Sequence, residues 1–257
     1  MENTRIEGKV DDTKDKTRDR IKTAIEGLDV MLKGGFLPSR NILLSGPCGS
    51  GKTILAMHFV YNGAMHFNEP GLFVTLEESK QKIYQDMAKF GMDLKKAEAS
   101  GNFILIGGPV ASLRTHMSKV DADIKDIIEE IEEIIKEKGI KRVAIDSINL
   151  LTMLLDEDAE KRKALASLCN TLSSLGCTSI LTSETREGSM ALSRYGIEEF
   201  VVDGVVVLYL VRQGSSFVPG ITIRKMRGSS HDKEIRVYKI TDKGIVVYPT
   251  ETMFTNI

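Results

Sequence analysis

The chain has 257 residues, of which 42% are hydrophobic and 28% are charged, and its formal net charge is −1. This length suits one large domain, and the balanced charge argues against a protein that holds nucleic acid or membranes by overall electrostatic attraction. The sequence has no run of about 18 apolar residues and no apolar leader, so we expect a cytoplasmic protein without membrane contact. The three cysteines, Cys48, Cys169 and Cys177, lack C-x-x-C spacing, which predicts free thiols in a reducing compartment.

The first 20 residues form a charged segment. They contain six acidic and six basic side chains and few apolar ones. Such a segment cannot bury enough apolar surface to offset the entropy of ordering it, so we expect a flexible N-terminal tail over residues 1–20. An arm that binds a partner is the alternative interpretation.

From residue 21 onwards, apolar strands and helices are predicted to alternate. Strands are expected over residues 41–45, 72–76, 103–106, 142–147 and 178–182. Helices are expected over residues 54–64, 79–90, 121–138 and 159–175. The helix over 121–138 has isoleucines at i, i+3, i+4 and i+7 positions with charges between them, which predicts an amphipathic helix packed on a core.

The pattern changes near residue 205, where four strands follow one another without helices between them. They are predicted over residues 205–211, 221–227, 234–240 and 245–248. Alternating strands and helices followed by consecutive strands predict an α/β fold. Its sheet is expected to be twisted, mostly parallel and flanked by helices, with an antiparallel group of strands at the C-terminus. No repeat or linker interrupts residues 21–257, so one domain is predicted over that range.

Residues 46–53 match the Walker A pattern G-x-x-x-x-G-K-[ST] of phosphate-binding loops, or P-loops. They are Gly46, Pro47, Cys48, Gly49, Ser50, Gly51, Lys52 and Thr53. The P-loop lies between a predicted strand and a predicted helix, so backbone N–H groups and the helix N-terminus could bind phosphate oxygens. Lys52 is expected to reach the β- and γ-phosphates, and the Thr53 hydroxyl is expected to bind Mg²⁺. The sequence therefore predicts a P-loop NTPase.

Carboxylates at two predicted strand ends could complete a hydrolytic site. Asp146 ends an apolar strand and is expected to hold Mg²⁺ through a water molecule, as a Walker B acid does. Glu77 and Glu78 follow another strand, and ligands bind outside the carboxyl ends of parallel strands. One of the two could activate the attacking water, and Glu77 is favoured because it is nearer the strand. Alternatively, the pair only complements the dipole of the next helix.

Positive charge for the transition state must come from late in the chain. Lys225 and Arg227 are two residues apart in a predicted strand, so their side chains point to the same face. Two adjacent cations suit a γ-phosphate better than a buried core. If they act on the nucleotide of a neighbouring subunit, the active unit is an oligomer. The alternative is a solvated edge strand whose charges oppose aggregation.

Over about residues 21–248 the chain resembles the RecA-superfamily ATPases of the KaiC type, found in many archaea as single-domain KaiC-like proteins. The resemblance rests on Gly27-Leu28-Asp29, the P-loop, Glu77-Glu78, residues 143–147, Thr182-Ser183-Glu184, residues 194–200 with Asp203, and residues 225–231. It implies a RecA-like fold, ATP and Mg²⁺ as cofactors, and hexameric rings with ATP bound between subunits.

The resemblance also implies roles for individual residues. Glu77 and Glu78 would be the family's tandem catalytic glutamates, and Lys225 and Arg227 its trans-acting basic pair. Three further residues match positions near the neighbour's nucleotide: His231, Lys233 and Asp242. Two-domain members carry adjacent Ser and Thr phosphoacceptors in their second half, where this chain has Glu199 and Phe200. An autokinase is therefore a lesser alternative.

The leading hypothesis is a ring-forming ATP hydrolase with a regulatory role and an unknown protein partner. A second hypothesis is a DNA-binding recombination accessory that resembles RecA and RadA. The loops that would then line the ring span residues 155–158, which are acidic, and 184–194, where two arginines are offset by two glutamates. Counterion release requires several net cations, so DNA binding is not favoured. A third hypothesis is an interaction module that binds ATP without appreciable hydrolysis.

Overall fold

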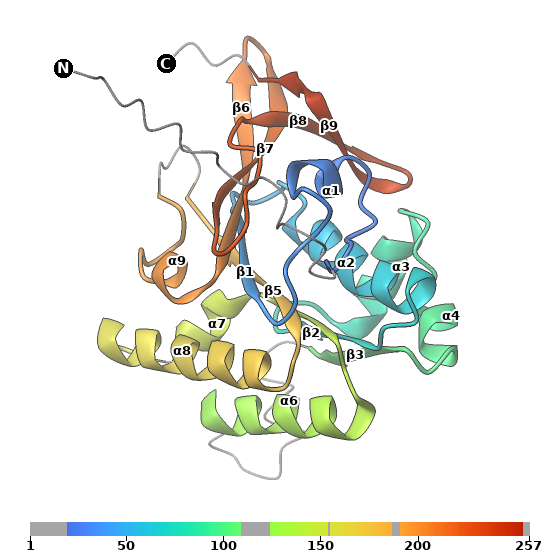
Figure 1. Cartoon of the computed structure of the whole chain (residues 1–257), viewed down its shortest axis with the longest axis vertical. Helices are drawn as coiled ribbons and strands as arrows, with labels where there is room; N and C mark the ends of the chain where they lie inside the picture. The colour runs from blue at the N-terminus through green and yellow to red at the C-terminus, as the bar shows by residue number, and fades with distance from the viewer. Residues whose placement is uncertain (1–19, 109–123, 154, 187–190, 254–257) are drawn as a thin grey trace, which may run out of the picture.

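The computed structural model describes residues 20–108, 124–153, 155–186 and 191–253 (Figure 1). These residues form one nine-stranded sheet in the order β3-β2-β4-β5-β1-β6-β7-β8-β9. The strands are β1 (Asn41–Gly46), β2 (Gly71–Thr75), β3 (Phe103–Gly107), β4 (Arg142–Asp146), β5 (Thr178–Glu184), β6 (Gly204–Gln213), β7 (Ser216–Met226), β8 (Arg236–Thr241) and β9 (Gly244–Thr252). Pairing is parallel from β3 to β6 and antiparallel from β6 to β9, which confirms the predicted α/β architecture.

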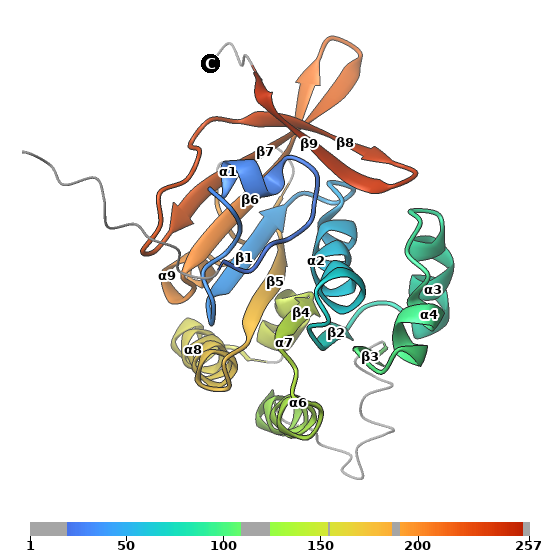
Figure 2. The same ribbon diagram turned by 45° about the vertical axis from the view of Figure 1, so that its right-hand side comes forward.

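Helices cover both faces of the parallel part of the sheet (Figure 2). They are α1 (Leu28–Met31), α2 (Lys52–His66), α3 (Lys80–Ala88), α4 (Leu94–Ala99), α6 (Ile124–Lys138), α7 (Ile148–Thr152), α8 (Asp158–Ser174) and α9 (Glu198–Val201). One hydrophobic core joins the sheet to α2, α3 and α4, and a second joins it to α6, α7 and α8. Within the described ranges, none of the helices combines the length and apolar character that crossing a membrane requires.

Successive residues of the central strands supply the two cores. In β1, Ile42 and Leu44 face the core with α2, whereas Leu43 faces the core with α8. Burial on both faces explains why these strands have continuous apolar runs in the sequence. The isoleucine stripe of α6 is buried as predicted, at Ile124, Ile127, Ile128, Ile131 and Ile135.

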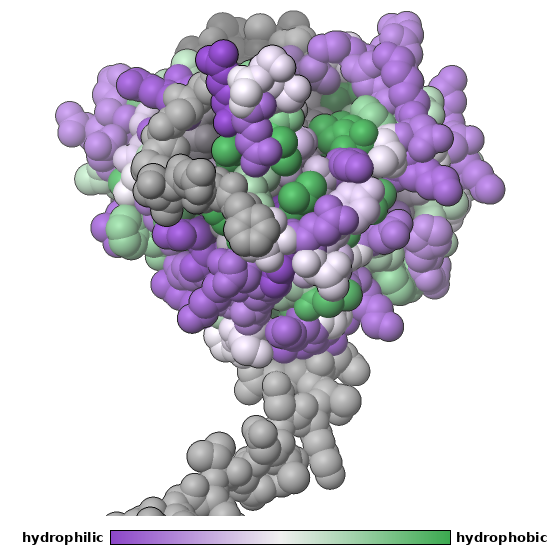
Figure 3. Space-filling model, turned by 90° about the horizontal axis from the view of Figure 1, so that it is seen from above, coloured by the Kyte–Doolittle hydropathy of each residue, from purple (hydrophilic) through white to green (hydrophobic). Residues whose placement is uncertain are grey.

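The β6–β7 hairpin is longer than predicted. The sequence placed the start of the second strand at residue 221, but β7 begins at Ser216 and continues through Pro219, which pairs with Leu210. The outer part of the hairpin is largely exposed, so it has no apolar alternation that sequence analysis could detect. Seen from the end that carries β6–β9, hydrophobic residues lie in small groups between hydrophilic ones (Figure 3).

Other differences concern short elements and the N-terminus. The helix α4 was not predicted, although Asp93 caps its N-terminus by accepting from the Lys96 N–H. The predicted tail lies outside the described residues, except for Arg20. The Arg20 guanidinium donates to the carbonyls of Leu32 and Gly35, so this last residue of the segment is docked on the domain.

Candidate nucleotide-binding site

The P-loop has the strand, loop and helix that its sequence predicts. The strand β1 ends at Gly46 and α2 begins at Lys52. Gly49 and Gly51 have φ angles of 76° and 84°, in the left-handed region that favours glycine. At Gly46 a Cβ atom would lie 2.8 Å from the Leu208 carbonyl oxygen, so there is no room for a side chain. These glycines let the loop turn tightly between the strand and the helix.

The Lys52 ammonium lies over the P-loop. Its Nζ donates to the carbonyls of Gly46 and Pro47, each at 2.9 Å. Burial lowers the pKa of Lys52, and the nearby carboxylates of Glu184 and Asp146 oppose this shift. Among the residues that the structure describes, the cation is held by two loop carbonyls and by longer-range attraction, and it can exchange these contacts for an anion.

Thr53 and Asp146 are in direct contact although 93 residues separate them. The Thr53 hydroxyl donates to Asp146 Oδ2 at 2.7 Å, and the Thr182 hydroxyl donates to Oδ1 at 2.5 Å. The strand β5, which carries Thr182, lies between β4, which ends in Asp146, and β1, which leads through the P-loop to Thr53 at the start of α2. Burial raises the pKa of Asp146, and the two hydroxyl donors oppose this shift. Thr182 occurs in the sequence motif of the resemblance, but the sequence indicates no contact with Asp146.

The donor set suits Mg²⁺. A hydroxyl and a carboxylate supply hard oxygen ligands, and Mg²⁺ in nucleotide sites takes only one or two protein ligands besides phosphates and water. Across the described ranges, no group of three or more His, Cys, Asp or Glu side chains could hold a metal ion. A cation at Thr53 and Asp146 would therefore depend on the oxygens of a bound phosphate.

Glu77 and Glu78 have different surroundings. The Ser147 hydroxyl donates to Glu77 Oε1 at 2.5 Å, which holds this carboxylate beside the end of β4. Glu78 instead forms an ion pair with Lys82 of α3 at 2.6 Å. The structure therefore brings Glu77, but not the carboxylate of Glu78, towards Asp146. Ser147 was not predicted to be a site residue.

Two pockets open beside these groups. One of about 490 Å³ is lined by Leu76, Glu77, Asn149, Leu150, Met153, Glu184 and Arg194. The other, of about 390 Å³, is lined by Pro47, Cys48, Glu184, Thr185, Arg186, Arg194, Leu210 and Phe217. The described part of the loop 184–194, predicted to face DNA in the second hypothesis, thus lines pockets next to the P-loop. Asn149 fixes the end of β5, because its Oδ1 accepts from the Glu184 N–H at 2.7 Å.

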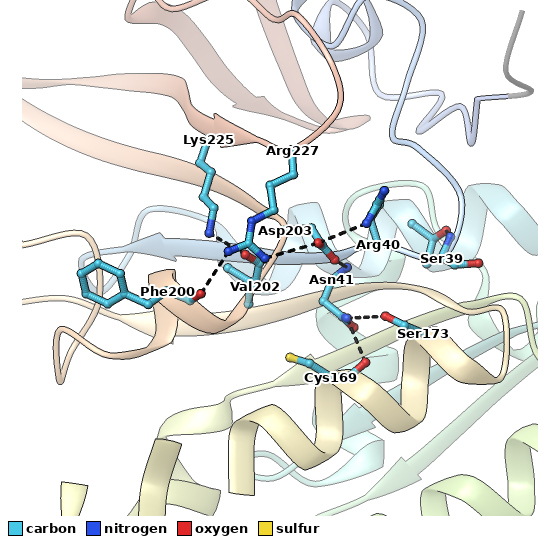
Figure 4. A network of polar contacts seen from close by, with 11 residues as sticks. Ser39, Arg40, Asn41, Cys169, Ser173, Phe200, Val202, Asp203, Lys225 and Arg227 are labelled. Carbon is cyan, nitrogen blue, oxygen red and sulfur yellow. Dashed lines mark hydrogen bonds and ion pairs between the residues drawn. The ribbon is translucent and has the colours of Figure 1, made fainter. Parts of the chain in front are cut away.

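Lys225 and Arg227 lie side by side, as the two-residue spacing predicts (Figure 4). Lys225 Nζ donates to the carbonyls of Glu199 and Val202, at 2.8 Å and 2.6 Å. Arg227 lies 3.7 Å from the Asp203 carboxylate and donates to the Phe200 carbonyl at 3.4 Å. Burial and the charge of Arg227 lower the pKa of Lys225. Both cations are held by the segment that contains α9.

This basic pair and the P-loop of the same chain lie at opposite edges of the sheet. Met226, between the two cations, pairs with Gly204, and Gly204 pairs with Ile42 at the start of β1. The P-loop follows the other end of β1. A strand of six residues separates these edges by roughly 20 Å. The basic pair therefore cannot contact a phosphate bound at its own P-loop.

The three residues that the resemblance groups near a neighbour's nucleotide are not together within the chain. His231 and Lys233 lie in the loop between β7 and β8, where Asp232 N–H donates to the Met31 carbonyl at 2.9 Å. Asp242 is in the exposed turn between β8 and β9, and its carbonyl faces Gly91. This turn belongs to the hairpin that packs on the P-loop of the same chain. The grouping of the three residues stays a prediction.

The chain is similar to known proteins over most of its length. Residues 21–252 match the family model described as "ATPase: KaiC". The chain is 37% identical over 235 residues to the circadian clock oscillator protein KaiC of Synechococcus elongatus, covering 91% of this chain and 45% of that protein. It is 34% identical over 241 residues to a UPF0273 protein of Methanocaldococcus jannaschii, covering 91% and 98%.

A solved structure is similar over most of this chain. It is that of a KaiC-like protein from Pyrococcus horikoshii, with a TM-score of 0.79, 37% identity, and coverage of 90% of this chain and 99% of that one. The chain thus spans less than half the length of the clock oscillator proteins and nearly all of the UPF0273 relative.

Proposed function

The chain belongs to the KaiC family of ATPases, and from this premise we propose that it binds and hydrolyses ATP with Mg²⁺ in a ring of identical subunits. The observation that carries the proposal is the contact between Thr53 and Asp146 beside the P-loop. It joins the Walker A and Walker B groups at the point where a phosphate-bound cation would lie. A regulatory role is proposed because relatives are named as circadian clock oscillator proteins.

Each group around the P-loop has a proposed task. Backbone N–H groups of the P-loop bind the phosphates, and Lys52 exchanges its two carbonyl contacts for phosphate oxygens. Thr53 would hold Mg²⁺ directly and Asp146 would hold it through water. When bound, Mg²⁺ neutralises charge on the β- and γ-phosphates. The Glu77 carboxylate, oriented by Ser147, accepts a proton from the attacking water.

The placement of the basic pair supports the proposed ring. Since Lys225 and Arg227 lie at the edge of the sheet opposite their own P-loop, they can serve a nucleotide only in the next subunit. Such a head-to-tail contact generates a closed ring when the rotation between subunits closes, and the family implies six subunits. Large apolar side chains are exposed near both edges, Phe200 beside the basic pair and Phe217 beside the P-loop. Exposed apolar groups of this kind support an interface.

Mixing two inactive variants tests the shared site. Arg227→Ala retains a complete P-loop, and Lys52→Ala retains the basic pair. Each alone should hydrolyse ATP far more slowly than the wild type, by at least ~10³-fold for a lost arginine finger. Mixed rings should recover activity, because some interfaces combine an intact P-loop with an intact basic pair. Co-purification of one variant through an affinity tag on the other confirms that mixed rings form, and mixed rings without recovery would contradict the proposal. Chelating Mg²⁺ should abolish turnover in the wild type.

A further inference from the structure

A hydrogen bond joins the C-terminal hairpin β8–β9 to the P-loop. The Tyr238 hydroxyl donates to the Ser50 carbonyl at 2.5 Å, across 188 residues of sequence. Both residues are completely buried, and burial raises the pKa of the Tyr238 hydroxyl, which therefore stays protonated and able to donate. Because water cannot replace this donor, its removal would leave the buried carbonyl without its partner.

The bond sets the direction of a backbone N–H group in the P-loop. The peptide between Ser50 and Gly51 is trans, so the Ser50 C=O and the Gly51 N–H point in opposite directions. Tyr238 draws the carbonyl towards the hairpin. The Gly51 N–H is thereby turned away from the hairpin, towards the side on which loop N–H groups can meet phosphate oxygens.

Side-chain packing holds the same peptide in place. Ile240 lies two residues after Tyr238 in β8 and therefore projects from the same face. A Cβ atom on Gly51 would lie only 2.9 Å from Ile240 Cδ1 and 3.4 Å from Ile245 Cδ1. Side chains of the hairpin thus pack against the P-loop backbone at Gly51.

A second contact ties the end of the hairpin to the helix that follows the P-loop. Gly244, at the start of β9, packs against the imidazole of His58 in α2, and a Cβ atom there would lie 2.0 Å from His58 Cε1. The hairpin is therefore fixed to α2 as well as to Ser50 and Gly51. Together these contacts form a support on the side of the P-loop that faces the hairpin.

We propose that the β8–β9 hairpin positions the P-loop for phosphate binding and that Tyr238 is its positioning residue. The proposal rests on the proposed nucleotide site, because the direction of the Gly51 N–H matters only if a phosphate binds there. It assigns a role in binding to a strand that contributes no Walker residue. The hairpin would position the P-loop equally in the ground state and in the transition state of hydrolysis. Its loss should therefore weaken nucleotide binding more than it slows the chemical step.

Removal of the hydroxyl tests the proposal. Tyr238→Phe keeps the ring and its packing but cannot donate to Ser50. We expect the Kd for Mg²⁺–ADP, measured by calorimetry well below the unfolding temperature, to rise roughly 3- to 30-fold. In steady state, the KM for ATP should rise by a similar factor with little change in kcat. A bond that only stabilised the fold would lower Tm and leave Kd unchanged, and that result would overturn the proposal.

Tyr248→Phe is the matched control. Tyr248 belongs to β9 of the same hairpin, and Tyr238 pairs with its neighbour Val247, so the two tyrosines project from opposite faces. Losing the Tyr248 hydroxyl should leave the Kd for Mg²⁺–ADP within about twofold of the wild type. An equal rise in both variants would show a general effect on the hairpin and would count against Tyr238 as the positioning residue.

Ile240→Val provides an independent variant should Tyr238→Phe fail to fold. It removes only the Cδ1 methyl that faces Gly51 and should raise the Kd in the same direction, by a smaller factor. An unchanged Kd in this variant would overturn the positioning role of the hairpin. If the wild type itself does not bind Mg²⁺–ADP, the proposed function fails. If the wild type binds Mg²⁺–ADP and the variants bind it with the same affinity, only the inference about the hairpin fails.

Discussion

At the scale of single residues, the neighbouring glutamates Glu77 and Glu78 differ in their contacts and therefore in their expected roles. Glu77 accepts a hydrogen bond from Ser147 at the end of β4, whereas Glu78 is paired with Lys82 of the following helix. A general base must be able to face the attacking water and accept its proton, whereas the Glu78 carboxylate is turned to the Lys82 ammonium. The surroundings thus favour Glu77 as the base, whereas Glu78 is held in an ion pair just before α3.

Separate substitutions distinguish the two glutamates. Glu77→Gln should lower kcat for ATP hydrolysis by at least ~10², because the amide cannot accept the proton. Glu78→Gln should lower it by less than ~10-fold, because only a partly exposed ion pair is lost. Both should bind Mg²⁺–ADP like the wild type. An equal loss in the two variants would mean that the carboxylates act together. Unchanged turnover in the Glu77→Gln, Glu78→Gln double variant would show that neither carboxylate is catalytic. It would favour an interaction module that binds ATP without appreciable hydrolysis.

The buried imidazole of His58 predicts a pH-dependent stability. Burial lowers its pKa to about 4, although a hydrogen bond with the Lys243 backbone opposes the shift. The unfolded chain, with a histidine pKa near 6.5, then binds more protons than the folded one between these values. The stability that the fold gains from keeping His58 neutral is therefore fully present above about pH 6.5. It is lost as the pH falls towards 4.

Urea unfolding across this range measures the effect. The free energy of unfolding of the wild type should fall, relative to His58→Gln, by up to about 1.4 kcal/mol per pH unit below pH 6.5. His66→Gln is the control, since His66 is exposed at the end of the same helix. It should retain the wild-type slope. Parallel stability curves for the wild type and His58→Gln would contradict the prediction.

At the scale of elements, the segment before β1 is joined to the C-terminal hairpin. A Cβ atom on Gly27 would lie 2.0 Å from the Val247 carbonyl oxygen of β9, and the Val247 N–H donates to the Glu26 carbonyl at 2.9 Å. The Asp29 carboxylate accepts from the N–H and hydroxyl of Thr23. The Gly27-Leu28-Asp29 motif therefore has a structural explanation: a turn that must approach β9 closely and be held by its own carboxylate.

A pair of glycine variants isolates this close approach. Gly27 and Gly101 have nearly the same φ, 77° and 79°, but a Cβ atom on Gly101 would meet nothing within 4 Å. Gly101→Ala should cost about 1 kcal/mol in the free energy of unfolding, from backbone strain alone. Gly27→Ala should cost at least ~2 kcal/mol more, because the methyl group collides with backbone of β9. Chemical denaturation compares the two, and equal costs would show that β9 moves aside freely.

At the scale of the whole molecule, the proposed active site is divided between two edges of one sheet. The Walker residues lie at the carboxyl end of β1, and the basic pair lies beside its amino end, where Asp203 binds Arg40 as well as Arg227. A ring of identical subunits brings such edges together in every interface. Side chains exposed elsewhere carry charges of both signs, as in the ion pairs along α6.

The DNA-binding alternative predicts a different whole-molecule behaviour. Residues 156–158 are acidic and exposed, and the described part of loop 184–194 lines the pockets beside the P-loop. We therefore expect no retardation of single-stranded DNA in a gel-shift assay at about 0.15 M salt, with or without Mg²⁺–ATP. Tight binding at that salt concentration, with affinity falling steeply as salt is added, would favour the recombination accessory over the regulator.

Four features could be predicted from the sequence: the α/β class, the P-loop with its strand and helix, the strand that ends in Asp146 and the amphipathic helix α6. These depend on short-range periodicity and on local motif chemistry, both contained in short windows of sequence. The length of the β6–β7 hairpin was not predicted, because the residues of β6 and β7 nearest the turn pair with each other without burying an apolar face.

The contacts that assemble a site from these elements form only in the folded chain. The order of strands places β5 between β1 and β4, so that Thr182 meets Asp146 and Asp146 meets Thr53. It also places Lys225 and Arg227 away from their own P-loop and brings Tyr238 to Ser50. Residues separated by tens to hundreds of positions are joined only when the sheet is assembled, because its order depends on the packing of the whole chain rather than on any local pattern.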